Sequence, residues 1–209
     1  MRRYSVRILL AVFLGGCVGG LVKEKPPAVY YELDYPSAAI DCSAGFDEGA
    51  TVRNFTVFSP FDRTEMVVEE SDRQIQFSGA HQWVDQPGRM VAEKLVRDMG
   101  AGNLFPRVGA AAGNALFPLE LTGRIGEFGW ERDGKGSRAM LQAEVSLVDT
   151  RSRDVLLQRN YRLESRPATA DDANAFAGEM SRLVQEFSTR LQQDLCETAI
   201  KIQGKKETR

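Results

Sequence analysis

The residues around Cys17 indicate most clearly which chemical reaction a side chain of this protein undergoes. Cys17 follows Leu14-Gly15-Gly16 at the end of a short apolar run, and Arg2, Arg3 and Arg7 precede that run. A basic segment, a short apolar segment and small residues before a cysteine are typical of a bacterial lipoprotein signal. The apolar run is too short to cross a bilayer as a helix. We predict cleavage before Cys17 and acylation of that cysteine; the alternative is an ordinary secretory signal that contains a cysteine.

Acylation would anchor the protein to a membrane without a spanning helix. Val18 stands where an aspartate is the usual retention signal for the inner membrane. By analogy with enterobacterial sorting, we predict that the protein lies on the outer membrane and faces the periplasm.

Cys42 and Cys196 are the remaining cysteines, near the start and the end of the predicted folded part. Disulfides form in the periplasm, so we predict a Cys42–Cys196 bridge. The alternative is two buried free thiols, because cysteine is among the most buried residue types.

The other residues with reactive side chains do not form a catalytic pattern. His81 is the single histidine, which excludes a site with several histidine ligands and leaves no Ser-His-Asp set. Residues 133–137 (DGKGS) lack the spacing of a phosphate-binding loop and lie between two predicted strands, and residues 109–113 lack a dinucleotide-binding spacing. The acid pairs Glu69-Glu70 and Asp171-Asp172 fit a turn and a first helical turn. We expect no enzyme activity, metal or cofactor.

Length and charge predict one domain that does not bind nucleic acid. Removing residues 1–16 from the 209 leaves 193, a size at which one core is the rule. The chain has 27 basic and 29 acidic residues, and loss of the three signal arginines leaves 24 basic residues and a net charge of −5. A nucleic-acid partner would require a basic face. We divide the chain into a signal (1–16), a lipidated tether (17–29), one domain (30–202) and a charged tail (203–209).

Alternating apolar residues predict strands along most of the domain. The first strands are expected over 30–35 and 51–58, followed by a hairpin of 66–69 and 73–77 with its turn at 70–72. Alternation resumes over 117–125, 141–147 and 155–163, with short polar connections, and predicts an antiparallel meander.

Two helices complete the prediction. Asp85 is a candidate cap for a helix over 87–99, which begins with a proline in its first turn. Thr169 is a candidate cap for a longer helix over 170–198, whose apolar stripe indicates packing on the sheet. The predicted fold is therefore α+β, an antiparallel sheet packed against two helices, the longer one C-terminal.

The order of several short motifs resembles that of a known family. The lipoprotein signal is followed by Tyr30-Tyr31-Glu32-Leu33-Asp34, then by residues 58–63 (FSPFDR) with Met66-Val67, and then by Trp83 ahead of a helix. This order is similar to that of the ABC-type transport auxiliary lipoproteins, the paraquat-inducible protein C-like family. The resemblance continues through the later strands and the closing helix. Phe61 is a mild departure, since the family more often has Tyr and Leu around this proline.

The resemblance implies a non-catalytic function and a set of partners. Members are expected to dock, at the outer membrane, the periplasmic MCE-domain protein of an ABC transport system that moves lipids or other hydrophobic molecules between membranes. A separate permease and ATPase would supply the energy. A homo-oligomer is compatible with such a partner. The alternatives are a lipoprotein that assists outer-membrane or secretin assembly, and a direct lipid carrier.

Three residues are candidates for partner docking. Phe61 offers an apolar anchor and Arg63 a multidentate donor, residue types that are frequent at interfaces. Trp83 is a third candidate. The alternatives are that residues 62 and 63 order a turn and that Trp83 belongs to the core.

Overall fold

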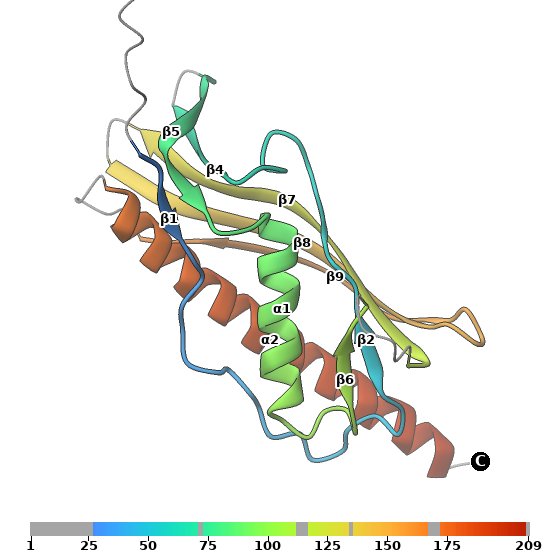
Figure 1. Cartoon of the computed structure of the whole chain (residues 1–209). Helices are drawn as coiled ribbons and strands as arrows, with labels where there is room; N and C mark the ends of the chain where they lie inside the picture. The colour runs from blue at the N-terminus through green and yellow to red at the C-terminus, as the bar shows by residue number, and fades with distance from the viewer. Residues whose placement is uncertain (1–26, 71–72, 112–116, 134–135, 167–171, 208–209) are drawn as a thin grey trace, which may run out of the picture.

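A single mixed sheet with both helices on one face makes up the fold (Figure 1). The computed structural model describes residues 27–70, 73–111, 117–133, 136–166 and 172–207. The longest strand, β7 (Leu119–Asp133), pairs antiparallel with β8 (Gly136–Asp149), which pairs antiparallel with β9 (Val155–Glu164). The α+β class and the predicted meander are therefore confirmed.

Short strands line the other side of β7. The strands β2 (Ala50–Val52), β3 (Thr56–Val57) and β4 (Glu65–Glu70) all run parallel to β7. Next to β4 lies β5 (Ile75–Trp83), which is antiparallel to it, and β1 (Val29–Tyr31) is parallel to β5 at the sheet edge. A further strand, β6 (Val108–Ala110), pairs with β2.

The N-terminal half of the sheet differs from the prediction in three places. The first strand ends at Tyr31, because the chain then leaves the sheet and buries Leu33 and Tyr35. The strand expected over 51–58 is two strands, since Phe55 between them turns inward and its N–H donates to the carbonyl of Gly88. The hairpin of β4 and β5 is confirmed, but β4 includes Glu70 and β5 continues to Trp83. Residues 71 and 72 of the predicted turn lie outside the described part.

The first helix, α1 (Pro87–Gly100), matches its predicted range, but its cap does not match. Gln86 occupies the N-cap position and makes no side-chain capping bond. The carboxylate of Asp85 instead accepts from the N–H of Gln86 and pairs with Arg89 at 3.1 Å. The predicted Asp85 cap is therefore wrong.

The second helix, α2 (Ala173–Glu207), packs its apolar stripe on β8 and β9. Every residue of the stripe is buried: Ala173, Phe176, Ala177, Met180, Leu183, Val184, Phe187, Leu191 and Leu195. Asp172 caps the first turn by accepting from the N–H of Ala175, whereas Thr169 lies outside the described residues. Core packing of this stripe is confirmed.

The C-terminal part of α2 is longer than predicted. Residues after 202 were expected to fray, yet the helix continues to Glu207. The side chain of Gln203 donates to the carbonyl of Gly45 at 2.6 Å, and Lys206 pairs with Asp47 at 2.8 Å. These contacts with the loop before β2 extend the helix into the predicted tail.

A buried carboxylate connects three parts of the chain under the sheet. Asp98 of α1 is fully buried and accepts from the hydroxyls of Tyr35 at 3.0 Å and Ser188 at 2.8 Å. The guanidinium of Arg97 lies 2.8 Å from the same carboxylate. Asp98 therefore joins the segment after β1 to both helices.

Neither described helix has a stretch that is both long enough and apolar enough to cross a membrane.

Candidate functional site

The predicted acylation site, Cys17, lies outside the described residues. The described chain begins next to β1, at residue 27. The lipid anchor therefore stays a prediction.

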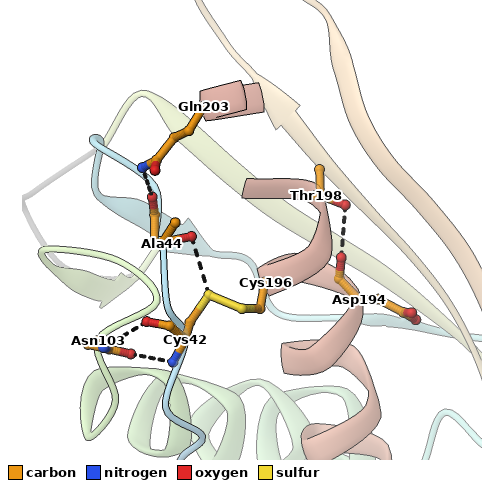
Figure 2. The surroundings of a disulfide bond; sticks show 8 residues. Cys42, Ala44, Asn103, Asp194, Cys196, Thr198 and Gln203 are labelled. Carbon is orange, nitrogen blue, oxygen red and sulfur yellow. Dashed lines mark hydrogen bonds between the residues drawn. A yellow bond between two sulfur atoms is a disulfide. The ribbon is translucent and has the colours of Figure 1, made fainter. Parts of the chain in front are cut away.

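Cys42 and Cys196 form a disulfide bond in the structure (Figure 2). Cys42 lies in the long loop between β1 and β2, Cys196 lies in α2, and their Cα atoms are 5.7 Å apart. The side chain of Asn103 fixes the loop at this point, because it accepts from the N–H of Cys42 at 2.8 Å and donates to its carbonyl at 3.0 Å. The bond thus connects the N-terminal loop to the last helix.

Two of the three predicted docking residues are buried in the core. Phe61 is 4% exposed and its ring covers Gly129 of β7. Trp83 is 1% exposed and its ring lies between those of Phe128 and Phe176. The docking prediction is wrong for Phe61 and Trp83, because β7 lies against the Phe61 ring and both β7 and α2 contact the Trp83 ring.

Arg63 is the docking candidate that remains partly at the surface. Its Nε donates to the carbonyl of Pro60 at 2.8 Å, and its guanidinium lies 3.7 Å from the centre of the Phe77 ring. The Arg63 side chain therefore both orders its own turn and packs over the neighbouring strand β5.

The polar residues considered for catalysis have structural partners. His81 lies in β5 rather than in a loop, and its Nδ1 is 3.1 Å from the Tyr31 hydroxyl. Glu70 pairs with Arg132 at 2.8 Å. Within the described ranges, no three His, Cys, Asp or Glu residues are close enough to hold a metal ion.

The two glycine-containing segments lie at strands of the sheet. Residues 133–137 span the β7–β8 turn, as predicted, although residues 134 and 135 lie outside the described part. Gly109 belongs to β6, and residues 112 and 113 lie outside the described part.

Burial shifts the pKa of three side chains. Burial raises the pKa of Tyr35, and the Asp98 carboxylate raises it further. Burial and a hydrogen bond to Asp194 likewise raise the pKa of Tyr161. The pKa of Glu69 is raised by burial and by the nearby carboxylates of residues 127 and 131. In each case the first cause is packing within the fold.

A groove of about 450 Å³ lies where the sheet extends past the start of α2. We call it the hairpin-end groove, because the β4–β5 hairpin forms one wall. Its apolar lining includes Met66, Val68 and Trp130, and its polar lining includes Gln76, His81 and Arg132. Sequence reasoning missed this groove because its lining comes from four strands and a helix terminus, and no single segment of the sequence indicates it.

The sequence also has the pattern of a defined family over most of this fold. The model of the family described as ABC-type transport auxiliary lipoprotein component matches residues 45–192. The chain belongs to this family. The match covers α1, the strands from β2 to β9 and most of α2. The core of the domain therefore lies within the part of the chain that matches the auxiliary lipoprotein family.

Crystal structures of other proteins share the fold of this auxiliary lipoprotein. A DUF330-family protein from Xanthomonas campestris has a TM-score of 0.72 at 15% identity, covering 86% of this chain and 99% of its own. An uncharacterized protein has a TM-score of 0.57 at 16% identity, covering 82% and 97%. PelC from Paraburkholderia phytofirmans, a dodecamer, has a TM-score of 0.49 at 11% identity, covering 75% and 93%. At these identities, the two structures with TM-scores of 0.72 and 0.57 indicate a shared fold alone. No curated protein sequence matches the chain.

Proposed function

We propose that this protein is a non-catalytic auxiliary component of an MCE-type ABC transport system for lipids or other hydrophobic substrates. It is anchored by acylated Cys17 to the outer membrane and faces the periplasm. The observation that carries this proposal is the family match over residues 45–192, which follows a lipoprotein signal at the start of the chain.

The arrangement of the domain supports a docking or anchoring function. The tether joins β1 at one end of the sheet, and α2 runs from that end to the other (Figure 1). A helix of 35 residues is about 52 Å long. The domain can therefore hold a periplasmic MCE-domain protein away from the membrane while a separate permease and ATPase drive transport.

Crosslinked affinity purification of the full-length lipoprotein from native membranes tests the proposal. We expect an MCE-domain protein to be recovered together with its permease and ATPase. Recovery of secretin or outer-membrane assembly components in their place would contradict the transport function.

A second experiment tests the anchor separately. Wild-type protein should pellet with outer membranes and yield an acylated N-terminal peptide that starts at Cys17, identified by mass spectrometry. The Cys17→Ser variant should lose both properties. A variant that is matured normally and still pellets with membranes would show that Cys17 is not the anchor.

The hairpin-end groove favours a second candidate function, direct lipid carriage. Its volume of about 450 Å³ lies within the usual range for small-molecule sites, and part of its lining is apolar. Lipid analysis of the domain purified without its anchor separates the two functions. Stoichiometric copurifying lipid would favour a carrier, whereas its absence would favour an auxiliary component.

A further inference from the structure

Exposed apolar side chains gather on the two strands next to the tether. Among the described residues, eight large apolar side chains are strongly exposed, and five of these belong to β1, to β5 or to the residue after β5. These five are Val29 (49% exposed), Tyr30 (62%), Ile75 (44%), Phe77 (45%) and Val84 (55%). They lie along the sheet edge that β1 and β5 form, with Val29 and Tyr30 on opposite sides of it, and we call this edge the β1–β5 apolar surface. Single exposed apolar residues are ordinary, but a group on two paired strands indicates an interaction surface.

The length of the tether limits how far this surface can lie from a membrane. The described chain starts at residue 27, and Val29 already pairs with His81 of β5. Residue 27 follows Cys17 by ten positions, and an extended chain spans at most about 3.6 Å per residue. A lipid on Cys17 therefore holds residue 27, next to the start of the β1–β5 apolar surface, within about 36 Å of the bilayer.

The composition of this surface suits the interface between lipid and water. Tyrosine combines an apolar ring with a polar hydroxyl, which favours the headgroup region. The guanidinium of Arg63 covers the Phe77 ring at 3.7 Å, and Arg73 is exposed at the turn of the same hairpin. Arginine beside apolar side chains can bind lipid phosphates while its stem packs on apolar surface.

We propose that the β1–β5 apolar surface rests in the headgroup region of the bilayer that carries the Cys17 anchor. The proposal rests on the anchor that the proposed function assigns, and it adds an orientation. β1, β5 and the β4–β5 hairpin face the lipid, and the opposite end of the sheet faces the periplasm.

The opposite end of the sheet provides a matched control. Val155 is 59% exposed, close to the exposure of Tyr30. Ile75 pairs with Glu69 of β4, which pairs with Glu131 of β7. Val155 pairs with Val148 of β8, which pairs with Glu120 of β7. The strand rises about 3.3 Å per residue, so these two positions on β7 are about 35 Å apart.

The test attaches the mature chain to vesicles without relying on cellular acylation. A chain that begins at Cys17 is oxidised so that Cys42 and Cys196 remain paired, and its Cys17 thiol is coupled to a maleimide lipid. The vesicles contain phosphatidylcholine and phosphatidylglycerol with brominated acyl chains, which quench nearby tryptophan. Three variants, Tyr30→Trp, Phe77→Trp and Val155→Trp, each add one tryptophan to the buried Trp83 and Trp130 of the wild type.

We expect at least about twofold quenching of the added tryptophan at positions 30 and 77, because interfacial side chains reach the acyl boundary. The tryptophan at position 155 should keep its emission. Equal emission at all three positions, or quenching strongest at position 155, would overturn the proposal. A concentration-dependent shift at positions 30 and 77 without quenching would assign the surface to a second copy and also overturn it. The mass of the native N-terminal peptide tests the anchor independently.

Discussion

Asp98 carries the densest set of polar contacts described in the core. Its carboxylate accepts from side chains of the segment after β1, of α1 and of α2, and it is fully buried. Removing charge from a buried group leaves its partners without an acceptor, which costs more than the same change at the surface. This residue therefore matters to stability although it has no place in the predicted function.

We expect Asp98→Asn to lower the free energy of unfolding by about 3 kcal/mol. The amide can accept through only one oxygen, and its N–H₂ group faces donors. Asp85→Asn is the control, because the Asp85–Arg89 pair is exposed and should contribute less than about 1 kcal/mol. Urea unfolding measures the free energy of unfolding of both variants. An equal decrease in the two would contradict a special contribution of the buried Asp98 carboxylate.

Gly123 tests how closely Phe55 packs on β7. A Cβ at this position would come within 3.0 Å of three atoms of the Phe55 ring. We expect Gly123→Ala to destabilise the fold by about 1–3 kcal/mol, as overpacking does. Gly126→Ala on the same strand is the control, since its Cβ would make contacts no shorter than 3.5 Å. Thermal unfolding that does not distinguish the two variants would argue against this packing.

The buried phenols predict a loss of stability in alkali. The pKa of Tyr35 and of Tyr161 is raised above the ordinary value of 10.0 in the folded protein. Below pH 10 both states carry neutral phenols, whereas above it the unfolded chain releases protons that the folded chain retains. The free energy of unfolding should therefore fall above pH 10, by up to about 1.4 kcal/mol per pH unit for each phenol.

Unfolding curves at a series of pH values measure this dependence, and Tyr161→Phe should reduce its slope. Phenolate absorbance of the folded protein should also show two tyrosines that do not ionise near pH 10. A slope that is unchanged in Tyr161→Phe would contradict the assignment.

At the scale of elements, periodicity predicted the long segments but merged β2 and β3 into one strand and missed β6. The 3/4 spacing of α2 and the alternation of β7, β8 and β9 are properties of each segment alone, so they could be read directly. The short strands β2, β3 and β6 exist because β7 and β2 offer parallel partners, and nothing within residues 50–57 or 108–110 specifies such a partner. The hairpin-end groove was unpredictable for the same reason.

The two helical glycines at Gly88 and Gly178 should respond oppositely to alanine. Gly178 is exposed on α2 with no atom within 4 Å of an added Cβ, so Gly178→Ala should stabilise the fold by about 0.5–1 kcal/mol through helix propensity. At Gly88 of α1 an added Cβ would collide with the backbone carbonyl of Phe55, so Gly88→Ala should destabilise it. Paired melting temperatures check this, and a shift of the same sign in both would contradict the packing of α1 on Phe55.

At the scale of the molecule, the disulfide joins positions 154 residues apart. Cross-links over long loops restrict the unfolded chain, typically by about 2–5 kcal/mol. We expect the Cys42→Ser, Cys196→Ser double variant to lose stability of this order in chemical unfolding. Mass labelling of the denatured, unreduced protein should find neither Cys42 nor Cys196 reactive, and labelling of both would show that the bond is absent from the native protein.

The site was less predictable than the fold at this scale. The disulfide could be predicted from the expected compartment and the number of cysteines, because only cysteine side chains form such a bond. Phe61 and Trp83 could not be assigned, because an aromatic residue at the end of an element has the same sequence pattern whether it faces the core or the solvent. Phe61 is buried against Gly129 and Trp83 against Phe176, and both contacts are distant in sequence.

The position of α2 at the end of the chain has a consequence for biogenesis. Part of the apolar face of the sheet is buried under α2, which follows every described strand along the chain. In the export that the proposed function implies, β8 and β9 would therefore cross the inner membrane before the helix that covers them. Until α2 follows, these strands would expose apolar side chains of the kind that holding chaperones bind.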